Sequence, residues 1–385
     1  MTSAYEILAQ LKRTASGPMT EARGAEPAFY WNEEVASAEE NAIFRHDWVC
    51  PGLASEIPDV GDYLTFSIAG EPVFSIRDSS GEIKTYANIC RHRMMQLLQG
   101  RGRTSRVTCP YHAWSYNLQG QLVGAGHMNH SAGFDKTKIC LPQIRTEIWN
   151  GWIYITLNLD AQSMKKTLAA LNDVVARYGM EHYVAVLNEE HVWQTNWKLL
   201  TENFMEGYHL PVAHKATVGA WFAPNKTVFP DQSYDSFTYQ TFAKTHAARY
   251  GQAHPDNTRL TGEWRNTSIL PTVFPTHMYV LAPDHLWYLS LRPRGVGAVD
   301  VRFGVAIAPE VDAMLTDTAE RAAWIRDLVA FFEHVNGEDR HVVEGIYAGS
   351  RSSFASPGQL SWLEREIHDF QKYLAQRLAP DTQRG

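Results

Sequence analysis

The stretch NICRHR at residues 88–93, followed by CPYHAWSY at residues 109–116, decides the fold of the first part of this chain. Each segment offers one cysteine and one histidine from a single tight loop. The sixteen residues between His92 and Cys109 leave room for a hairpin that brings the two loops together. Thiolate and imidazole are ligands that suit iron–sulfur clusters and zinc. The four candidate ligands are Cys90, His92, Cys109 and His112.

A structural zinc site is the alternative for these four residues. Zinc modules usually pair Cys with Cys and His with His, whereas each loop here supplies one of each. A mixed pair in each loop fits a Rieske [2Fe–2S] centre, in which one iron takes two thiolates and the other takes two imidazoles. The two segments, with Gly120 after them, also resemble the Rieske signature. We therefore predict that the four residues hold one [2Fe–2S] cluster per subunit.

The two loops depart from the Rieske consensus in two ways. Met94 and Ala113 stand where many relatives have Gly, and we expect this change to affect loop packing and not ligation. Rieske proteins of respiratory complexes carry two further cysteines that bridge the loops, where this chain has Met95 and Tyr111. Without that disulfide, the centre resembles the lower-potential oxygenase type.

A second candidate metal site lies in residues 202–214, ENFMEGYHLPVAH. His209 and His214 are five residues apart, which on one continuous helix would place them about 140° apart. Pro211 disfavours helical geometry in the residue before it and cannot donate an N–H. We therefore expect the helix that starts at Asn196 to end near His209, and the chain to turn and bring His214 back. Glu206 would lie one turn before His209 on the same face.

Two histidines need a carboxylate to form the facial triad that leaves open positions on Fe(II). Asp339, in the stretch NGEDRHVVE at 336–344, is the candidate, and Glu338 is the runner-up because spacing alone cannot separate neighbours. The alternative is a chance pairing of histidines, since the chain has 16 of them.

The two sites in this order resemble the α-subunit of Rieske non-haem iron oxygenases, in the aromatic-ring-hydroxylating dioxygenase superfamily, over nearly the whole chain. The resemblance implies one Fe(II) per subunit held by His209, His214 and Asp339, with O₂ as co-substrate. It also implies a homotrimer assembled head to tail. In that trimer Glu206 would link a Rieske histidine of one subunit to an iron histidine of the next, so we count Glu206 and Asp339 as the catalytic residues.

The predicted fold class is α+β. Runs rich in β-branched and aromatic residues between Trp48 and Leu157 indicate a small sandwich or barrel. After about residue 160, helices and a second set of strands indicate an antiparallel sheet flanked by helices. With the resemblance, this gives a helical or extended segment at 1–44 that packs on the catalytic domain, an all-β Rieske domain at 45–160 and a helix-grip catalytic domain at 161–385.

Composition limits the partners and the compartment. The chain has 385 residues, 44% of them hydrophobic, and a net charge of −7 with no basic block, so neither nucleic acid nor an anionic membrane is expected as a partner. The sequence shows no signal peptide and no apolar run of about 20 residues, so a cytoplasmic protein is expected. Cys50 and Cys140 have no histidine close by and are expected to be small buried apolar residues.

The electrons must come from a partner. The chain has neither a dinucleotide-binding GxGxxG opening a βαβ unit nor a plant-type ferredoxin cysteine run. The resemblance implies a separate flavin-containing NAD(P)H reductase, with or without a ferredoxin.

The substrate is expected to be a small organic molecule. Most family members have Asp in the bridging place and act on aromatic rings. This chain has Glu206 there, followed by PVAH at 211–214, and is most similar to the carnitine, glycine betaine and choline monooxygenase branch. That similarity implies oxidation of a quaternary ammonium compound with C–N cleavage or N-demethylation. The alternatives are hydroxylation or dihydroxylation of an aromatic compound or aryl carboxylate and, more remotely, a Rieske electron-transfer protein with a degenerate second site.

Aromatic faces bind such cations, and the second half of the chain is rich in aromatic residues. We expect about three in four of them to pack in the core. The residues considered are Trp221, Phe222, Tyr234, Phe237, Tyr239, Trp264, Trp287 and Tyr288.

Overall fold

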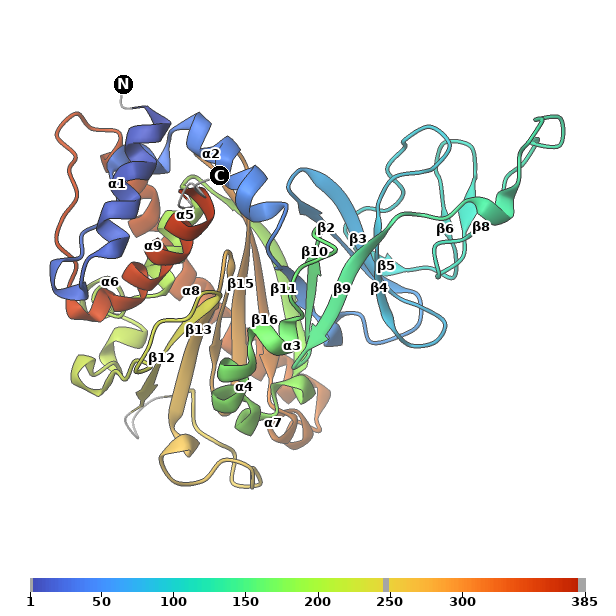
Figure 1. Cartoon of the computed structure of the whole chain (residues 1–385). Helices are drawn as coiled ribbons and strands as arrows, with labels where there is room; N and C mark the ends of the chain where they lie inside the picture. Colours follow the sequence, from blue (N-terminus) through green and yellow to red (C-terminus); the bar gives the residue numbers. More distant parts are fainter. Residues whose placement is uncertain (1–2, 245–248, 380–385) are drawn as a thin grey trace. The chain divides into compact units, whose positions relative to one another are not determined.

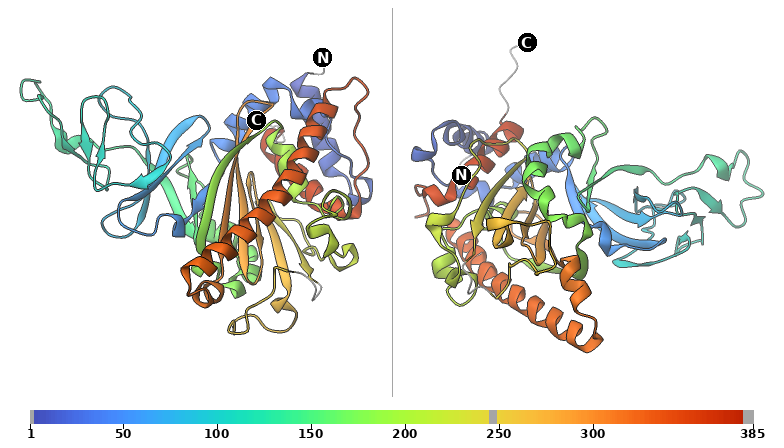
Figure 2. Two further views of the ribbon diagram at one scale, coloured as in Figure 1. Left: turned by 180° about the vertical axis from the view of Figure 1, so that it is seen from behind. Right: turned by 90° about the horizontal axis from the view of Figure 1, so that it is seen from below.

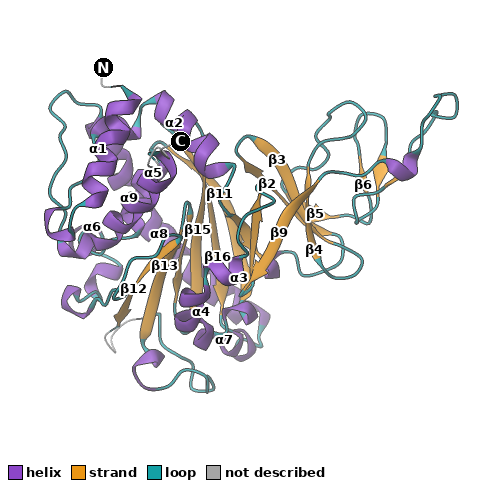
Figure 3. Ribbon diagram, viewed as in Figure 1, coloured by secondary structure: helices purple, strands orange, loops and turns teal. Residues whose placement is uncertain are grey.

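A computed structural model describes residues 3–244 and 249–379 of the chain (Figure 1). Contacts between Cα atoms divide the chain into two compact units. The β unit is Phe44–Met164, and the α+β unit combines Met1–Ile43 with Lys165–Gly385. Both units are built on antiparallel sheets, and the helices are concentrated in the α+β unit (Figure 3). The predicted fold class is confirmed.

The β unit contains a seven-stranded antiparallel sheet in the order β1-β10-β9-β4-β3-β2-β5 and a small three-stranded sheet β6-β7-β8. In β2, residues Leu64, Phe66 and Ile68 alternate toward the core, which is the period-two pattern of a strand with one buried face. The strands are β1 (Val49–Leu53), β2 (Asp62–Ile68), β3 (Glu71–Arg77), β4 (Ile83–Ala87), β5 (Arg101–Arg103), β6 (Val107–Thr108), β7 (Ser115–Tyr116), β8 (Leu122–Gly124), β9 (Gln143–Trp149) and β10 (Trp152–Thr156).

The core of the β unit joins the large sheet to the two loops that carry the predicted cluster ligands. Phe74 and Ile76 of β3 and Tyr86 of β4 belong to one buried cluster with Cys90 and Cys109. Gly120 lies beside this cluster with a φ of +78°, and a Cβ there would come within 2.6 Å of the Tyr86 ring. Position 120 therefore requires glycine, both for its backbone conformation and for its close approach to the ring.

The sheet of the α+β unit has six antiparallel strands in the order β11-β16-β15-β14-β13-β12. Its strands are β11 (Val184–Trp193), β12 (Phe237–Ala243), β13 (Thr267–Val273), β14 (His277–Leu281), β15 (His285–Pro293) and β16 (Val299–Ile307). Its α-helices are α1 (Ala4–Ser16), α2 (Glu33–Glu39), α4 (Ala169–Val175), α5 (Trp197–Phe204), α6 (Leu210–Ala213), α7 (Pro309–Met314), α8 (Thr318–Ser350) and α9 (Arg365–Leu378), with α3 (Met164–Thr167) at the junction.

The long helix α8 crosses one face of this sheet, as both views in Figure 2 show. Phe332 of α8 packs against Trp287 of β15 with ring centroids 5.5 Å apart. On the same helical layer, Trp197 of α5 meets Phe370 of α9 edge to face at 5.8 Å. The core of the unit therefore lies between the sheet and the helices α5, α8 and α9.

One predicted helix ends earlier than expected. The helix expected from Asn196 to His209 ends at Phe204, because the carboxylate of Glu206 accepts the backbone N–H groups of Tyr208 and His209 and closes a turn in place of helical hydrogen bonds. Helix α8 runs without interruption through Gly337, from Thr318 to Ser350.

The prediction for Cys140 is also wrong. Cys50 is buried as expected, but Cys140 is exposed, in an isolated bridge to Gln121 at the edge of the small sheet. No helix within the described ranges is long and apolar enough to cross a membrane.

The N-terminal segment is joined to the α+β unit by buried polar contacts. The ammonium of Lys198 pairs with the carboxylate of Glu39, and the indole N–H of Trp197 donates to the same carboxylate at 2.8 Å. The side chains of Lys198 and Glu39 are only 1% and 3% exposed, so each depends on the other for its counter-charge.

Replacing Lys198 with Met should lower the free energy of unfolding by about 3–5 kcal/mol, because it leaves the Glu39 carboxylate buried without a counter-charge. The double variant Lys198→Met with Glu39→Gln should recover much of the loss, since Gln keeps an acceptor for Trp197 and removes the charge. Chemical denaturation followed by circular dichroism measures both. The exposed Lys165→Met is the control and should stay within about 0.5 kcal/mol of the parent chain. A single variant as stable as that control would contradict the assignment.

Candidate metal centres

The two loops with the predicted cluster ligands share one backbone geometry. In the first loop, the Cys90 N–H donates to the carbonyl of Met95 at 2.8 Å, and the Met94 N–H donates to the carbonyl of Cys90 at 3.1 Å. The second loop repeats both bonds at the same spacing and lengths, between Cys109 and Trp114 and between Ala113 and Cys109. Each loop is thus a tight turn that begins at the cysteine.

This turn explains the glycine that relatives have at two positions. Met94 and Ala113 adopt φ values of +57° and +55°, a left-handed conformation that a residue with a Cβ adopts at a cost of about 1–2 kcal/mol. The Met94 side chain is 80% exposed, so it meets no steric conflict with the core. The substitutions therefore add backbone strain, and each loop keeps the hydrogen bonds of the turn.

The four ligand side chains are divided between the inside and the surface. Cys90 and Cys109 are 2% and 3% exposed, whereas His92 and His112 are both exposed. The two imidazole rings lie 4.8 Å apart, and that of His92 stacks on Trp114 at 4.7 Å with an interplanar angle of 9°. Buried sulfur and exposed imidazole match a cluster in which one iron takes two thiolates and the other takes two imidazoles.

The hydroxyl of Tyr116 lies beside the buried sulfur. It is 3.4 Å from Cys90 Sγ and accepts the Arg91 N–H at 3.0 Å. Burial raises the pKa of Tyr116, and the neighbouring thiol of Cys90 adds to this shift, so the phenol keeps its proton and can donate to sulfur. Hydrogen bonds to cluster sulfur are one of the ways in which a protein sets the reduction potential.

The ligand pattern of these loops differs from that of a structural zinc site, since each loop supplies one cysteine and one histidine. The assignment of the [2Fe–2S] cluster to these four residues therefore rests on their pattern and stays a prediction.

The second candidate site is formed by three segments of the α+β unit. Asp339 lies on α8, and the short helix α6 has His209 immediately before it and His214 immediately after it. The turn of α6 brings the two histidines together, with their Nε2 atoms 3.1 Å apart. As expected, no continuous helix runs through both histidines; Pro211 occupies the first turn of the separate helix α6, where no N–H is needed.

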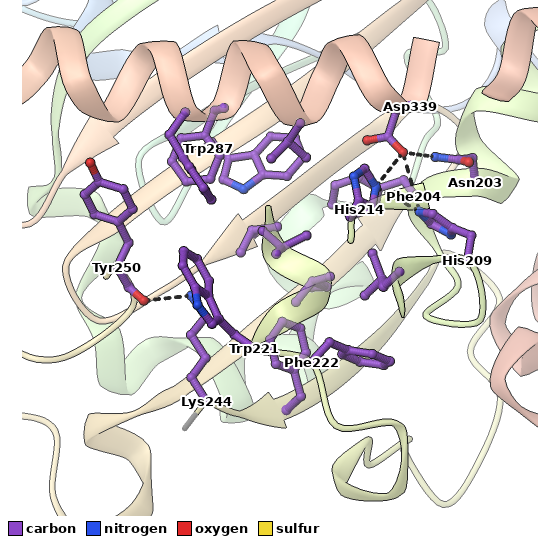
Figure 4. A pocket seen from close by; sticks show the side chains of 18 of the residues that line it. Asn203, Phe204, His209, His214, Trp221, Phe222, Lys244, Tyr250, Trp287 and Asp339 are labelled. Carbon is purple, nitrogen blue, oxygen red and sulfur yellow. Dashed lines mark hydrogen bonds and ion pairs between the residues drawn. The ribbon is translucent and has the colours of Figure 1, made fainter. Parts of the chain in front are cut away.

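Three ligand atoms converge on one point in this site (Figure 4). Asp339 Oδ1 is 3.0 Å from His214 Nε2 and 3.4 Å from His209 Nε2. Ligands about 2.1 Å from a metal on one face of an octahedron would be roughly 3 Å apart. The triangle of two nitrogens and one oxygen therefore fits a single transition metal with its opposite face open.

A second layer of side chains holds the three ligands. The Nδ1 atom of His209 pairs with Glu206, and the Nδ1 atom of His214 lies 2.8 Å from Glu338 Oε2. Glu338, the runner-up for the third ligand, thus faces the nitrogen that points away from the metal position. Carboxylates in this place fix the tautomer and the ring orientation of metal-binding histidines.

Two further residues complete the second layer, and no motif in the sequence pointed to either. Asn203 donates its amide to Asp339 Oδ1 at 2.7 Å, and Thr217 donates its hydroxyl to Glu338 Oε2 at 2.6 Å. Asn203 lies on α5, whereas Asp339, the ligand that it contacts, lies on α8. Only the tertiary structure brings these pairs together.

The electrostatics of the site favour a cation. Burial by itself would lower the pKa of His209, but hydrogen bonds to Asp339 and Glu206 outweigh burial and raise this pKa to about 10. Burial would raise the pKa of Asp339, yet the two histidines lower it to about 2. The carboxylates thus create a negative potential at the point where the ligand atoms converge, as metal binding requires.

An apolar cavity of about 80 Å³ opens beside the triad. Of the eight aromatic residues considered from the sequence, Trp221, Phe222 and Trp287 line it, and the other five do not. Further rings come from Phe204, Phe242, Tyr250, Phe331 and Phe332. The space suits a small organic molecule with mainly apolar contacts.

Comparison with known proteins identifies the family. Residues 180–380 match the model of the ring hydroxylating alpha subunit (catalytic domain), and residues 47–141 match that of the Rieske [2Fe-2S] domain. The chain belongs to this family. The predicted resemblance, the order of the two domains and the two kinds of metal cofactor are confirmed.

Several members of the family are similar to this chain in sequence. The glycine betaine monooxygenase oxygenase subunit of Chromohalobacter salexigens is 33% identical over 218 residues, covering 55% of this chain and 49% of the relative. The carnitine monooxygenase oxygenase subunit of Escherichia coli is 33% identical over 189 residues, covering 48% and 50%. The match thus spans about half the length of these relatives. The chloroplastic choline monooxygenase of Beta vulgaris is 27% identical over 363 residues, covering 92% and 75%.

Solved structures show the same fold. The quaternary ammonium Rieske monooxygenase CntA in complex with L-carnitine has a TM-score of 0.79 at 22% identity, covering 94% of this chain and 97% of that one. The naphthalene 1,2-dioxygenase from Rhodococcus sp. bound to indole also has a TM-score of 0.79 at 22% identity, with coverage of 99% and 100%. One fold therefore accommodates both a quaternary ammonium compound and an aromatic ligand.

Replacing Asp339 with Ala should remove the mononuclear iron and leave the cluster, so that the iron content falls from about three to about two atoms per subunit. Replacing Glu338 with Gln leaves all three iron ligands in place. It should weaken iron binding about 10- to 100-fold, because His214 loses its orienting carboxylate. Iron analysis, the visible spectrum of the cluster and competition with a chelator distinguish these outcomes. The exposed Glu333→Gln on the same helix is the matched control. Loss of iron in Glu338→Gln with full retention in Asp339→Ala would reverse the two roles.

Proposed function

We propose that this chain is the oxygenase component of a multicomponent system that oxidises a betaine-like quaternary ammonium compound with O₂. The observation that carries the proposal is the convergence of His209, His214 and Asp339 at the end of an aromatic cavity. When bound, the cluster supplies single electrons and the ferrous iron supplies activation of O₂. Cys90, His92, Cys109 and His112 would hold the cluster.

The cavity supports a cationic substrate. A methylated ammonium ion cannot donate an N–H and is bound through the faces of aromatic rings. Trp221 and Trp287 line the cavity and offer the indole rings that bind cations best. The negative potential that the carboxylates create around the triad also favours a positively charged substrate. A substrate held here would present a carbon next to its nitrogen to the metal position.

The proposed reaction balances as a monooxygenation. One atom of O₂ enters a C–H bond next to the nitrogen, and the other leaves as water with two protons and two electrons. The new hydroxyl on that carbon makes the C–N bond labile, so an amine and an aldehyde are released. The two electrons would come from NAD(P)H through a separate flavin-containing reductase, with or without a ferredoxin.

Oxidation of an aromatic compound or aryl carboxylate is the second candidate function. The aromatic lining of the cavity favours it too, because rings stack on rings as well as on cations. A Rieske electron-transfer protein with a degenerate second site is less well supported. Such a protein would have no reason to keep three ligand atoms and their second-layer carboxylates in register.

A screen with a surrogate reductase tests the substrate class. Betaines, methylamines, aryl carboxylates and simple arenes would each be assayed for coupled uptake of O₂ and consumption of NADH. We expect coupled turnover with release of formaldehyde or amine from a betaine. A cis-diol or phenol from an aromatic compound would overturn the preference. Two irons per subunit, with no substrate-dependent O₂ uptake, would instead favour the electron-transfer protein.

We further propose that the chain acts in the cytoplasm as a homotrimer in which Glu206 connects two metal sites. Its carboxylate accepts from His209 and keeps 11% of its side-chain surface exposed, so an imidazole of a second copy could reach it. The exposed His92 and His112 are the imidazoles that such a contact would use. A carboxylate between two imidazoles fixes both and shortens the path for an electron.

Replacing Glu206 with Gln should slow turnover at least about tenfold in enzyme reconstituted to full metal content, since the amide keeps the shape but loses the charge-assisted contact. Reoxidation of the reduced cluster by O₂ and substrate, followed by stopped-flow absorbance, would slow by the same factor. Glu333→Gln again serves as the control. Full turnover of a metal-replete Glu206→Gln would contradict the bridging role.

A further inference from the structure

Among the described residues that line the cavity beside the triad, Lys244 is the one lysine or arginine. Lys244 follows β12 directly and lines the cavity. Its backbone N–H donates to the carbonyl of Asn266 at 2.9 Å, which holds the backbone from which the side chain extends. Its ammonium group has a long contact of 3.4 Å to the carbonyl of Tyr250. A single contact of that length leaves most of its donor capacity for something else.

The nearby acidic side chain does not neutralise Lys244 directly. Asp284 accepts the Gly251 N–H at 2.8 and 2.9 Å and pairs with His285 Nδ1 at 2.7 Å. No carboxylate among the described residues comes within 4.0 Å of the Lys244 ammonium. Burial lowers the pKa of Lys244 to about 8, opposed by the charge of Asp284, so the amine remains mostly protonated near pH 7. Lys244 is half-buried at the cavity wall, where an anion that joins it would be favoured.

The local backbone leaves room for this ammonium group. Gly251 has a φ of +92°, and a Cβ at that position would collide with the end of the Lys244 side chain. The Gly251 N–H is bound to Asp284, so the glycine is held in place. The structure thus provides a fitted position for the ammonium at the wall of the cavity.

The other amide, carboxylate and imidazole groups that line the cavity are already engaged. Asn203, Glu206 and the three metal-site residues bind one another, and His285 binds Asp284. The rest of the lining is aromatic or aliphatic. Figure 4 shows Lys244 and the triad at opposite ends of the cavity. A ligand that spans the cavity therefore meets a metal position at one end and a fixed cation at the other.

We propose that Lys244 binds a carboxylate group of the substrate and so holds the far end of the molecule while the carbon to be oxidised lies at the metal position. This inference rests on the proposed function and narrows it to zwitterionic betaines that carry a carboxylate, as against choline or simple methylamines. The trimethylammonium group would lie over the indole rings, away from Lys244. Like charges are thereby kept apart, and each end of the substrate meets the opposite charge or a ring face.

Two pairs of probes test the inference, and each pair differs in a carboxylate: glycine betaine with choline, and benzoate with benzyl alcohol. The holoenzyme and its Lys244→Met and Lys244→Arg variants would be compared by kcat/KM for coupled O₂ uptake and by calorimetric Kd. For the carboxylate member that binds, Lys244→Met should lower kcat/KM and the affinity about 10- to 100-fold. Lys244→Arg should retain most of the affinity. The member without a carboxylate should change less than about threefold. The exposed Lys226→Met is the matched control.

The outcomes separate this inference from the proposed function. An equal loss for both members of a pair, or a parent enzyme that binds neither carboxylate probe, overturns the role of Lys244. If betaine and choline are oxidised equally well and Lys244→Met has no effect, the role of Lys244 is overturned. The quaternary ammonium function then still stands. A Lys244-dependent preference for benzoate, with no binding of glycine betaine, upholds the role and overturns the proposed substrate class.

Discussion

The structure of the catalytic half depends on placing three electron-rich atoms around one point. Without a cation, the carboxylate of Asp339 pairs with the protonated histidines, as the raised pKa of His209 and the lowered pKa of Asp339 indicate. Hydrogen bonds with Glu206, Glu338 and Asn203 keep the three ligands in this arrangement. The helices α5, α6 and α8 are arranged around this point, and the cavity opens on its free side.

The early end of α5 follows from the same constraint. A helix continued to His209 would direct the carboxylate of Glu206 along the helix surface. In the observed turn, that carboxylate instead accepts two backbone N–H groups and faces the imidazole of His209. Gly207 allows the turn, because a Cβ there would come within 2.6 Å of the Phe222 ring at the cavity wall. A local departure from helical geometry thus positions a ligand and shapes the cavity together.

The sequence was sufficient to predict a site or an element where the ligand residues and their spacing lie within a short segment. Cys90 with His92, and Cys109 with His112, define two loops whose hydrogen bonds prove to be the same, and a strand such as β2 follows from residue type and alternation. It was insufficient where the contact is long-range. Asn203 touches Asp339 across 136 positions, and Lys244 enters the cavity only because β12 ends beside it. Cys140 was misjudged because an isolated cysteine carries no signal of which face of an edge bridge it occupies.

The discontinuity of the α+β unit has a consequence for how the chain folds as it is synthesised. The β unit is one uninterrupted stretch, so all of its contacts can form while later residues are still being translated. The α+β unit must wait, because α1 packs on α9: His368 Nε2 lies 3.0 Å from the carbonyl of Gly17, and Gln371 donates to that of Arg23 at 2.9 Å. Helix α1 therefore keeps its apolar face uncovered until α9 has been synthesised. Premature termination anywhere before α9 would leave that face without its native partner.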